Sequence, residues 1–264
     1  MNNIIKTLGL IWNPQDDYFT FRATQIDSKV TPTKRKVLSE IGQLFDPLGF
    51  LGPVIVFAKL VMQDIWRLGL NWDKDLPDEL VRKWIQFREQ LPAVNHMRKP
   101  RCVSQDDAVT LELHGFSDAS RRAYGAVVYM RSITADGTIC VNLVASKSRV
   151  APLKPTTIPR LELCGAKLLA ELVQKVISAM KIQFHTVKLW CDSQIGLCWI
   201  KKPPTMLNQF VANRVAAIVE LTQCYQWGYI QTDDNPADAV SRGELPENLL
   251  LKKQWWCGAQ MLSA

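Results

Sequence analysis

The sequence predicts an α/β protein in which a mixed sheet of about five strands has helices on its faces, preceded by a small, mainly helical segment. Two observations support this prediction. Apolar residues before residue 95 recur mostly with helical spacing, whereas after residue 106 many of them form short runs rich in Val, Ile and Tyr. The later part also runs in the order strand, strand, strand, helix, strand, helices, strand, helix. Strands joined by short turns run antiparallel, and strands reached through helices can join them in parallel.

The first hundred residues supply mainly helices. Residues 8–23 predict two strands around a turn at 13–17, where Asn, Pro and Asp gather. Helices are expected at 31–46, 54–69 and 77–91. Thr31 or Thr33 can cap the first of them. The polar stretch 95–106 predicts a linker.

The remaining residues supply the mixed sheet. Strands are expected at 108–120, 122–132, 138–150, 185–193 and 226–232. Helices are expected at 160–180, 194–200, 207–222 and 236–242. No internal repeat or low-complexity segment interrupts this order.

The composition limits the class of protein. The chain has 264 residues, 47% of them hydrophobic and 22% charged, which is enough apolar material for a folded core in one large or two compact domains. The net charge of +7, spread over both halves, mildly favours a polyanionic partner. Seven cysteines without a CxxC pair indicate a reducing compartment, and three histidines make a zinc site improbable. We expect neither a signal peptide nor a membrane span.

Four carboxylates occupy related places in this predicted fold. Asp118 and Asp192 end the first and fourth strands, and ligand groups in open α/β sheets gather at such ends. Glu162 and Asp238 are each expected in the first turn of a helix, shortly after a proline.

Each acid alone also has a simpler explanation. An acid in the first turn of a helix complements the helix dipole, and an acid at a strand end is common in turns. The apolar neighbours of Asp192 and Glu162 argue against that explanation. Four acids at one edge of a sheet could not all stay ionised without cations, and an oxygen-only set favours Mg²⁺ or Mn²⁺.

The residues around these acids resemble a known family. Asp118, Glu162, Asp192 and Asp238 follow the order Asp–Glu–Asp–Asp of the ribonuclease H fold, and their flanks resemble the ribonuclease H domain in the polyprotein of BEL/Pao-type LTR retrotransposons. The matching stretches are GFSDAS (115–120), ASKSRVAPLKPTTIPRLEL (145–163), WCDS (190–193), FVANRV (210–215) and NPADAVSRG (235–243). An unrelated structural α/β protein would need all of these to be coincidence.

The resemblance implies a domain organisation. Residues 1–100 resemble the end of a reverse-transcriptase palm followed by a thumb and connection-like helical segment. Residues 106–244 resemble the ribonuclease H-like domain, and residues 245–264 resemble the start of the linker toward an integrase. No YxDD polymerase motif, DTG or DSG protease motif, or zinc-binding integrase module is present, so we expect none of those activities from this chain.

The resemblance also implies an activity: hydrolysis of the RNA strand of RNA–DNA hybrids with two Mg²⁺ ions, for which Mn²⁺ can substitute. Asp118 would bridge both ions, with Asp192 and Glu162 on one side and Asp238 on the other. Glu162 would also lie near the RNA 2′-hydroxyl, with Ser120 as a second contact. Candidate contacts to the nucleic-acid backbone are Lys147, Arg149, Lys154, Arg160, Arg214 and Arg242.

One residue departs from the family pattern. Relatives commonly carry a histidine in the strand before the NPAD motif, and Tyr229 stands at that place here. Tyrosine, with a pKa near 10, is a poor substitute in proton movement at neutral pH. The alternative is therefore a catalytically weak or inactive nucleic-acid-binding or assembly fragment of a polyprotein.

The expected partners follow from the same resemblance. They are an RNA–DNA hybrid and the upstream palm and fingers of the same polyprotein, without a membrane. A cytoplasmic retrotransposon particle is the expected location, with the nucleus as the alternative. The sequence does not indicate an oligomeric state.

Overall fold

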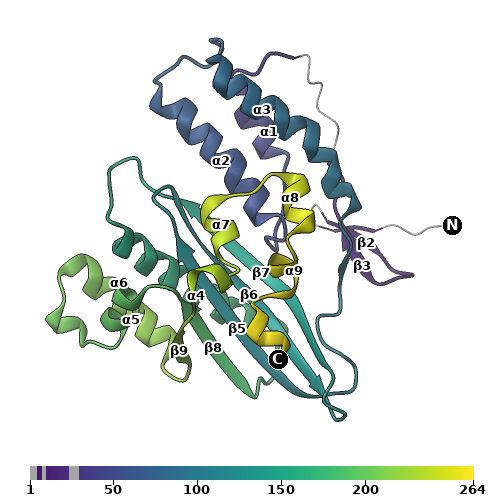
Figure 1. Ribbon diagram of the computed structural model, residues 1–264, viewed down its shortest axis with the longest axis vertical. Coiled ribbons are helices and arrows are strands. Elements are labelled where there is room, and N and C mark those ends of the chain that lie inside the picture. Colours follow the sequence, from purple (N-terminus) through teal and green to yellow (C-terminus); the bar gives the residue numbers. More distant parts are fainter. Residues whose placement is uncertain (1–4, 8–9, 24–29) are drawn as a thin grey trace. The chain divides into compact units, whose positions relative to one another are not determined.

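The computed structural model describes residues 5–7, 10–23 and 30–264, and the chain divides into two compact units (Figure 1). The first unit comprises residues 1–47, 51–102 and 243–252. The second comprises residues 48–50, 103–242 and 253–264. None of the helices in these described ranges has the length and hydropathy needed to cross a bilayer.

The first unit combines a small antiparallel sheet with helices. Its strands lie in chain order and are β1 (Ile5–Thr7), β2 (Leu10–Asn13), β3 (Tyr18–Thr20) and β4 (Lys99–Pro100). Its helices are α1 (Lys34–Gly42), α2 (Gly52–Arg67), α3 (Asp78–Gln90), the 3₁₀ helix η1 (Leu91–His96) and α8 (Pro246–Leu251). The turn at 13–17 and its flanking strands are confirmed, while residues 8 and 9 of that prediction lie outside the described residues.

Two expectations for this unit are wrong in detail. The stretch 95–106 is not wholly a linker, because its first residues end η1 and its Lys99–Pro100 pair with β3. The first helix begins after Thr33, whose side chain accepts a hydrogen bond from the Lys36 amide at 3.4 Å, but it ends at Gly42 rather than residue 46. Asp46 instead accepts a hydrogen bond from the Leu51 amide at 2.7 Å, just before α2.

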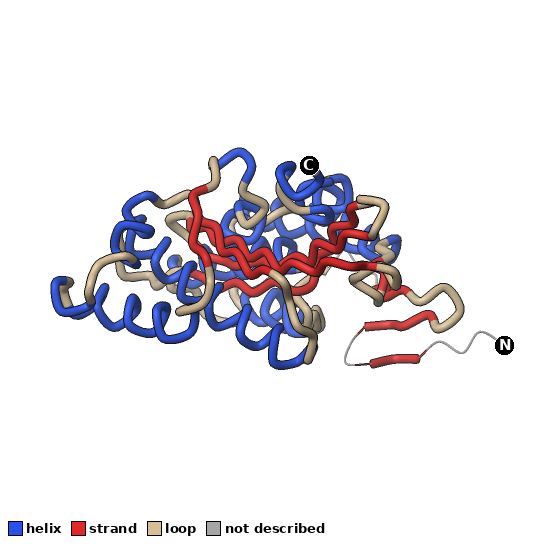
Figure 2. Tube along the Cα trace, turned by 90° about the horizontal axis from the view of Figure 1, so that it is seen from below, coloured by secondary structure: helices blue, strands red, loops and turns tan. Residues whose placement is uncertain are grey.

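The second unit is built on the predicted mixed sheet, in the order β7–β6–β5–β8–β9, and the strands form a twisted layer (Figure 2). The strands are β5 (Ala108–Ala119), β6 (Ala123–Thr134), β7 (Ile139–Val150), β8 (Thr186–Cys191) and β9 (Gln226–Tyr229). The first three run antiparallel, and β8 and β9 join in parallel. The predicted fold class, a mixed five-stranded α/β sheet with flanking helices, is confirmed.

Helices complete the second unit. They are α4 (Ile158–Met180), α5 (Gln194–Ile200), η2 (Pro204–Met206), α6 (Gln209–Thr222), η3 (Thr232–Asp234), α7 (Asp238–Arg242), α9 (Lys253–Cys257) and η4 (Gln260–Ser263). The predicted long helix α4 buries leucines and alanines on two sides. One side packs on the sheet, where Leu169 meets Ala126 and Leu189 in one core cluster, and the other packs on α6 through a second cluster that includes Leu163. The sequence did not predict α8, α9 or η4.

A candidate active site at the carboxyl ends of two parallel strands

Two of the predicted carboxylates lie side by side because of strand pairing. Strands β5 and β8 are parallel neighbours, and their last paired residues are Ser117 and Cys191. Asp118 and Asp192 follow these residues, so both acids leave the sheet at the same edge. This is the point where the chain order of the sheet reverses, with β6 on one side of β5 and β8 on the other.

Helix α4 brings the third carboxylate, Glu162, to this edge. The helix can approach because Gly165 has no side chain: a Cβ there would lie 3.1 Å from the main-chain oxygen of Asp118. Since α4 begins at Ile158, Glu162 lies beyond the first turn, and the predicted first-turn position is wrong. Complementation of the helix dipole, strongest in the first turn, therefore explains this acid less well.

Helix α7 brings the fourth carboxylate, Asp238, which is its first residue as predicted. Gly125, the partner of Asp118 across β5 and β6, makes room for this helix. A Cβ there would lie 2.3 Å from a side-chain carbon of Val240. Asn235 prepares the start of the helix, because its side chain accepts a hydrogen bond from the Ala237 amide at 3.1 Å.

The electrostatics of Asp118 link it to two of the other acids. Burial, the largest cause, and the charges of Asp192 and Asp238 together raise the pKa of Asp118 to about 7, against a hydrogen bond from Ser241 that lowers it. Asp118 is only 6% exposed, so water screens these charges weakly. Three acids from three separate segments therefore share one electrostatic environment.

Glu162 belongs to the same environment. Burial raises the pKa of Glu162, the charge of Asp192 adds to this rise, and a hydrogen bond from Ser193 opposes it. The buried thiol of Cys191 lies in the same environment. Burial, the largest cause, and the charges of Asp192, Glu162 and Asp118 together raise the pKa of that thiol to about 12.

Two residues of α7 occupy carboxylate oxygens of the cluster. The hydroxyl of Ser241 donates to Asp118 Oδ2, and Arg242 forms an ion pair with Asp238. With these partners in place, no three His, Cys, Asp or Glu side chains of the described residues are arranged as metal ligands. Arg242, a candidate phosphate contact in the sequence, thus lies against the acid cluster.

The donor chemistry of the cluster nevertheless fits a hard divalent cation. All four side chains offer oxygen ligands. Within the described part of the chain, Asp192 Oδ1 is buried and has no hydrogen-bond partner. The carboxylates also repel one another, and a bound cation would relieve that repulsion. Asp118, Glu162, Asp192 and Asp238 are the residues that would hold the ion.

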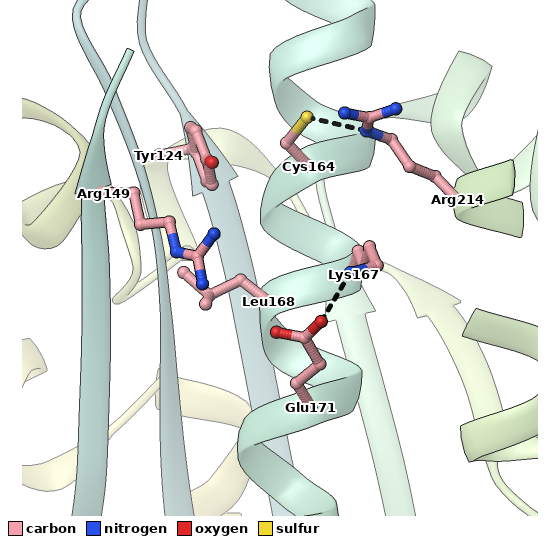
Figure 3. Close-up of a pocket in the computed structure, with 7 residues that line it drawn as sticks. All are labelled: Tyr124, Arg149, Cys164, Lys167, Leu168, Glu171 and Arg214. Atoms are coloured by element: carbon pink, nitrogen blue, oxygen red, sulfur yellow. Dashed lines mark hydrogen bonds and ion pairs between the residues drawn. The ribbon is translucent and has the colours of Figure 1, made fainter. Parts of the chain in front are cut away.

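Two of the predicted basic residues, Arg149 and Arg214, lie beside α4 (Figure 3), and a third, Arg160, is part of that helix. Arg149 from β7 and Arg214 from α6 line a small open pocket of about 70 Å³. Arg214 lies with its guanidinium carbon 3.5 Å from the centre of the Phe210 ring, and Arg160 lies 5.1 Å from the same centre. The sequence did not point to Tyr124, Cys164, Lys167, Leu168 and Glu171, which complete the lining.

Within this pocket, two contacts restrain the cations. Arg214 Nε donates to Cys164 Sγ at 3.2 Å, and Lys167 Nζ pairs with Glu171 at 2.5 Å. Four of the residues that sequence reasoning missed here, Cys164, Lys167, Leu168 and Glu171, share one face of α4 because their spacings of three and four match the helical repeat. The sequence shows that spacing, but it does not show which strands pack against that face of α4.

The other candidate residues take different positions. Lys147 on β7 and Lys154 in the following loop are exposed. Ser120 uses its hydroxyl inside the protein, donating to the main-chain oxygen of Ser241 at 2.7 Å. Tyr229 is the last residue of β9, pairs with Cys191 and is 47% exposed.

Comparison with solved structures gives several partial likenesses. Ribonuclease H1 from the halophilic archaeon Halobacterium salinarum NRC-1 is 22% identical, with 49% of this chain and 93% of that chain covered and a TM-score of 0.31. LC11-RNase H1 in complex with an RNA/DNA hybrid is 16% identical, with coverages of 53% and 99% and a TM-score of 0.34. The foamy viral protease-reverse transcriptase in complex with an RNA/DNA hybrid is 14% identical, with coverages of 87% and 29% and a TM-score of 0.48.

The family assignment rests on other observations. No curated protein matches the chain. A family model described as the Pao retrotransposon-like RNaseH-like domain matches residues 33–193, which is more than half of the chain. The match contains Asp118, Glu162 and Asp192 and ends before Asp238. Together with the strand order of the sheet, this match shows that the chain belongs to the family of Pao retrotransposon-like RNaseH-like domains.

Proposed function

We propose that the chain hydrolyses the RNA strand of RNA–DNA hybrids in a divalent-metal-dependent reaction during retrotransposon reverse transcription. The observation that carries this proposal is the shared environment of Asp118, Glu162, Asp192 and Asp238, which come from four separate segments. A family match alone would support a fold. The gathering of four acids at the sheet edge supports the chemistry.

The carboxylates would hold Mg²⁺, with Mn²⁺ as a substitute. Divalent ions bound there supply an activated water and neutralise charge on the phosphate and the leaving oxygen. The protein's own contribution is to hold the acids in place. Strand pairing sets Asp118 beside Asp192, Gly165 lets α4 bring Glu162, and Gly125 lets α7 bring Asp238.

A basic surface beside these acids would receive the hybrid backbone. Arg149, Arg160 and Arg214 gather near the first half of α4, and Lys147 and Lys154 are exposed on β7 and the loop after it. Phosphate contacts supply sequence-independent affinity, which a nuclease acting along a hybrid needs. By this proposal Ser120 and Glu162 lie near the RNA 2′-hydroxyl, the group that distinguishes RNA from DNA.

A second candidate is a nucleic-acid-binding fragment that cleaves weakly or not at all. Two observations favour it. Tyr229 stands where relatives have a histidine, and Arg242 occupies an oxygen of Asp238. Under this alternative the basic residues bind a hybrid and the acids serve only to organise the fold.

A binding and cleavage assay separates the two candidates. The full chain is mixed with a labelled RNA–DNA hybrid in EDTA, and Mg²⁺ is then added. The proposal predicts binding in EDTA and cleavage of the RNA strand after Mg²⁺, with double-stranded DNA left intact. Binding without cleavage at any Mg²⁺ or Mn²⁺ concentration supports the fragment alternative and contradicts the proposed activity.

The wider setting is proposed on the same basis. The first unit would correspond to the end of a reverse-transcriptase palm with a thumb and connection, and residues 245–264 to the start of a linker toward an integrase. The polymerase palm and fingers of the same polyprotein would be its partner. A cytoplasmic retrotransposon particle would be its place of action.

A further inference from the structure

Two serines connect the last helix of the second unit to its central strand. Ser241 is completely buried on α7, and its hydroxyl donates to Asp118 Oδ2. Its main-chain oxygen in turn accepts a hydrogen bond of 2.7 Å from the hydroxyl of Ser120, which lies just after β5. The side chain and main chain of one residue therefore hold α7 to the strand that carries Asp118.

The hydroxyl of Ser241 has a choice of acceptor. A serine inside a helix commonly donates to the carbonyl one turn earlier, and here the Asp238 carbonyl oxygen lies 3.0 Å away. An ionised carboxylate, as Asp118 would be with a cation bound, is a stronger acceptor than a main-chain carbonyl. The hydroxyl of Ser241 also reaches out of the helix to the acid on the strand.

Helix α7 depends on such contacts for its position. It has only five residues, too few for its own hydrogen bonds to keep it folded in water. Val240, the residue before Ser241, packs where Gly125 leaves space, and Gly125 is the strand partner of Asp118. The bond from Ser241 to Asp118 thus joins the helix that carries Asp238 to the strand that carries Asp118, beside the place where Val240 packs on the neighbouring strand β6.

We propose that Ser241 is a positioning residue of the acid cluster: its buried hydroxyl fixes one oxygen of Asp118, so that the other can face a divalent ion held with Asp238. The inference rests on the proposed metal-dependent function and adds a residue to it. Partners of metal-binding side chains typically change metal affinity or activity by 10- to 100-fold when removed.

The chain offers a matched control for the removal of this hydroxyl. Ser117 is next to Asp118 and is 1% exposed, and its hydroxyl has no hydrogen-bond partner within the described residues. Replacing either serine by alanine removes one buried oxygen from the same neighbourhood. Only Ser241→Ala removes a hydrogen bond to Asp118.

The test measures Mn²⁺ binding to the full chain by electron paramagnetic resonance, together with kcat and KM for hybrid cleavage. Melting curves confirm that each variant is folded at the assay temperature. We expect Ser241→Ala to weaken Mn²⁺ binding by about 10-fold or more and to lower kcat while KM for the hybrid stays constant. Ser117→Ala should match the wild type in all three values.

The possible results distinguish failure of the positioning role of Ser241 from failure of the proposed metal-dependent cleavage. Wild-type Mn²⁺ affinity and kcat in Ser241→Ala overturn the positioning role and leave the proposed activity standing. Equal losses in Ser117→Ala and Ser241→Ala overturn it as well, because they would indicate a general packing effect. A wild type that binds no Mn²⁺ overturns the metal site and the role of Ser241 together.

If the wild type binds Mn²⁺ without cleaving, only the activity fails, and the metal affinities still decide the role of Ser241. Should Ser241→Ala not fold, Ser241→Cys provides a second variant with a weaker donor. It should bind Mn²⁺ more weakly than the wild type. An affinity equal to that of the wild type would contradict the inference.

Discussion

His114 illustrates, at the scale of single residues, how this fold holds polar groups in its interior. The imidazole is 4% exposed on β5. Trp190 Nε1 donates to its Nδ1 at 3.2 Å, so the neutral ring carries its proton on Nε2 and donates to Glu112 at 3.1 Å. Arg131 also pairs with Glu112, at 3.0 Å. A second proton on the ring would point at the Trp190 donor.

This arrangement predicts a loss of stability in mild acid. Burial lowers the pKa of His114, Lys188 and Arg131 add to this, and Glu112 opposes it. Because the folded state binds the proton less readily, the contribution is present above the ordinary pKa of 6.5 and is lost as the pH falls below it. The loss is at most about 1.4 kcal/mol per pH unit for one group. Glu112, whose pKa is lowered overall, acts in the same direction at lower pH.

Urea unfolding between pH 7.5 and pH 5.5 checks this prediction. His114→Gln should unfold with a weaker pH dependence than the wild type. His96→Gln, which changes an exposed histidine at the end of η1, should keep the wild-type dependence. The same slope in His114→Gln and the wild type would show that another group causes it.

At the scale of elements, two glycines decide how closely the helices approach Asp118. Gly165 lets α4 reach the main chain of β5, and Gly125 lets α7 reach β6. Both glycines lie in residues 106–244, which contain the family motifs. Spacing along the chain does not reveal which helix packs against each glycine, so their role in helix approach could not be predicted.

Gly125→Ala should therefore displace α7. Its Cβ would lie 2.3 Å from a side-chain carbon of Val240, and such overpacking typically costs about 1–3 kcal/mol. Hydrogen-exchange mass spectrometry should show faster exchange in the peptide spanning α7. Gly42→Ala is the matched change, since a Cβ there meets nothing within 4 Å, and it should leave that peptide unchanged. Slow exchange in Gly125→Ala would show that the close packing is not needed.

The sequence predicted elements well where periodicity and local signals agree. The five strands of the second unit, the long helix α4 and the Thr33 cap follow from alternation, apolar spacing and a capping residue. The sequence did not predict elements that form only by pairing with residues far away in the chain. The two-residue strand β4 exists because Lys99 and Pro100 lie beside Tyr18 and Phe19, about eighty residues earlier in the chain. The short helices near the C-terminus carry too few residues for a periodic signal.

The candidate site could be anticipated in part. An acid at a strand end is recognisable, and so is its place in a motif, so all four carboxylates could be named as candidates, and their role stays a prediction. The hydroxyl of Ser241 could not be assigned to Asp118, because nothing local distinguishes it from a serine bonded to its own helix. Arg242 stays a candidate phosphate contact, and its ion pair with Asp238 four residues earlier was not foreseen.

At the scale of the whole molecule, a basic chain should bind nucleic acid with a strong dependence on salt. The net charge is +7, and Arg149, Lys167 and Arg214 line one pocket along α4. Each lost phosphate contact reduces the slope of log affinity against log salt by about 1.

Arg149→Gln should reduce this slope for hybrid binding in EDTA, as measured by fluorescence anisotropy between about 50 and 200 mM salt. Lys175→Gln removes the same charge from an exposed position further along α4 that does not line the pocket. It should keep the wild-type slope. Identical slopes in all three proteins would place the hybrid elsewhere on the surface.

The central claim is that the acids at the sheet edge act together in metal-dependent cleavage of hybrid RNA. The most direct measurement is the rate at which the full chain cleaves a labelled hybrid with Mg²⁺, in three proteins. Asp233→Asn changes an exposed acid in η3 and should leave the rate unchanged, whereas Asp192→Asn removes an acid beside Asp118 and should abolish cleavage while the fold remains. Equal cleavage by Asp192→Asn and the wild type would contradict the claim.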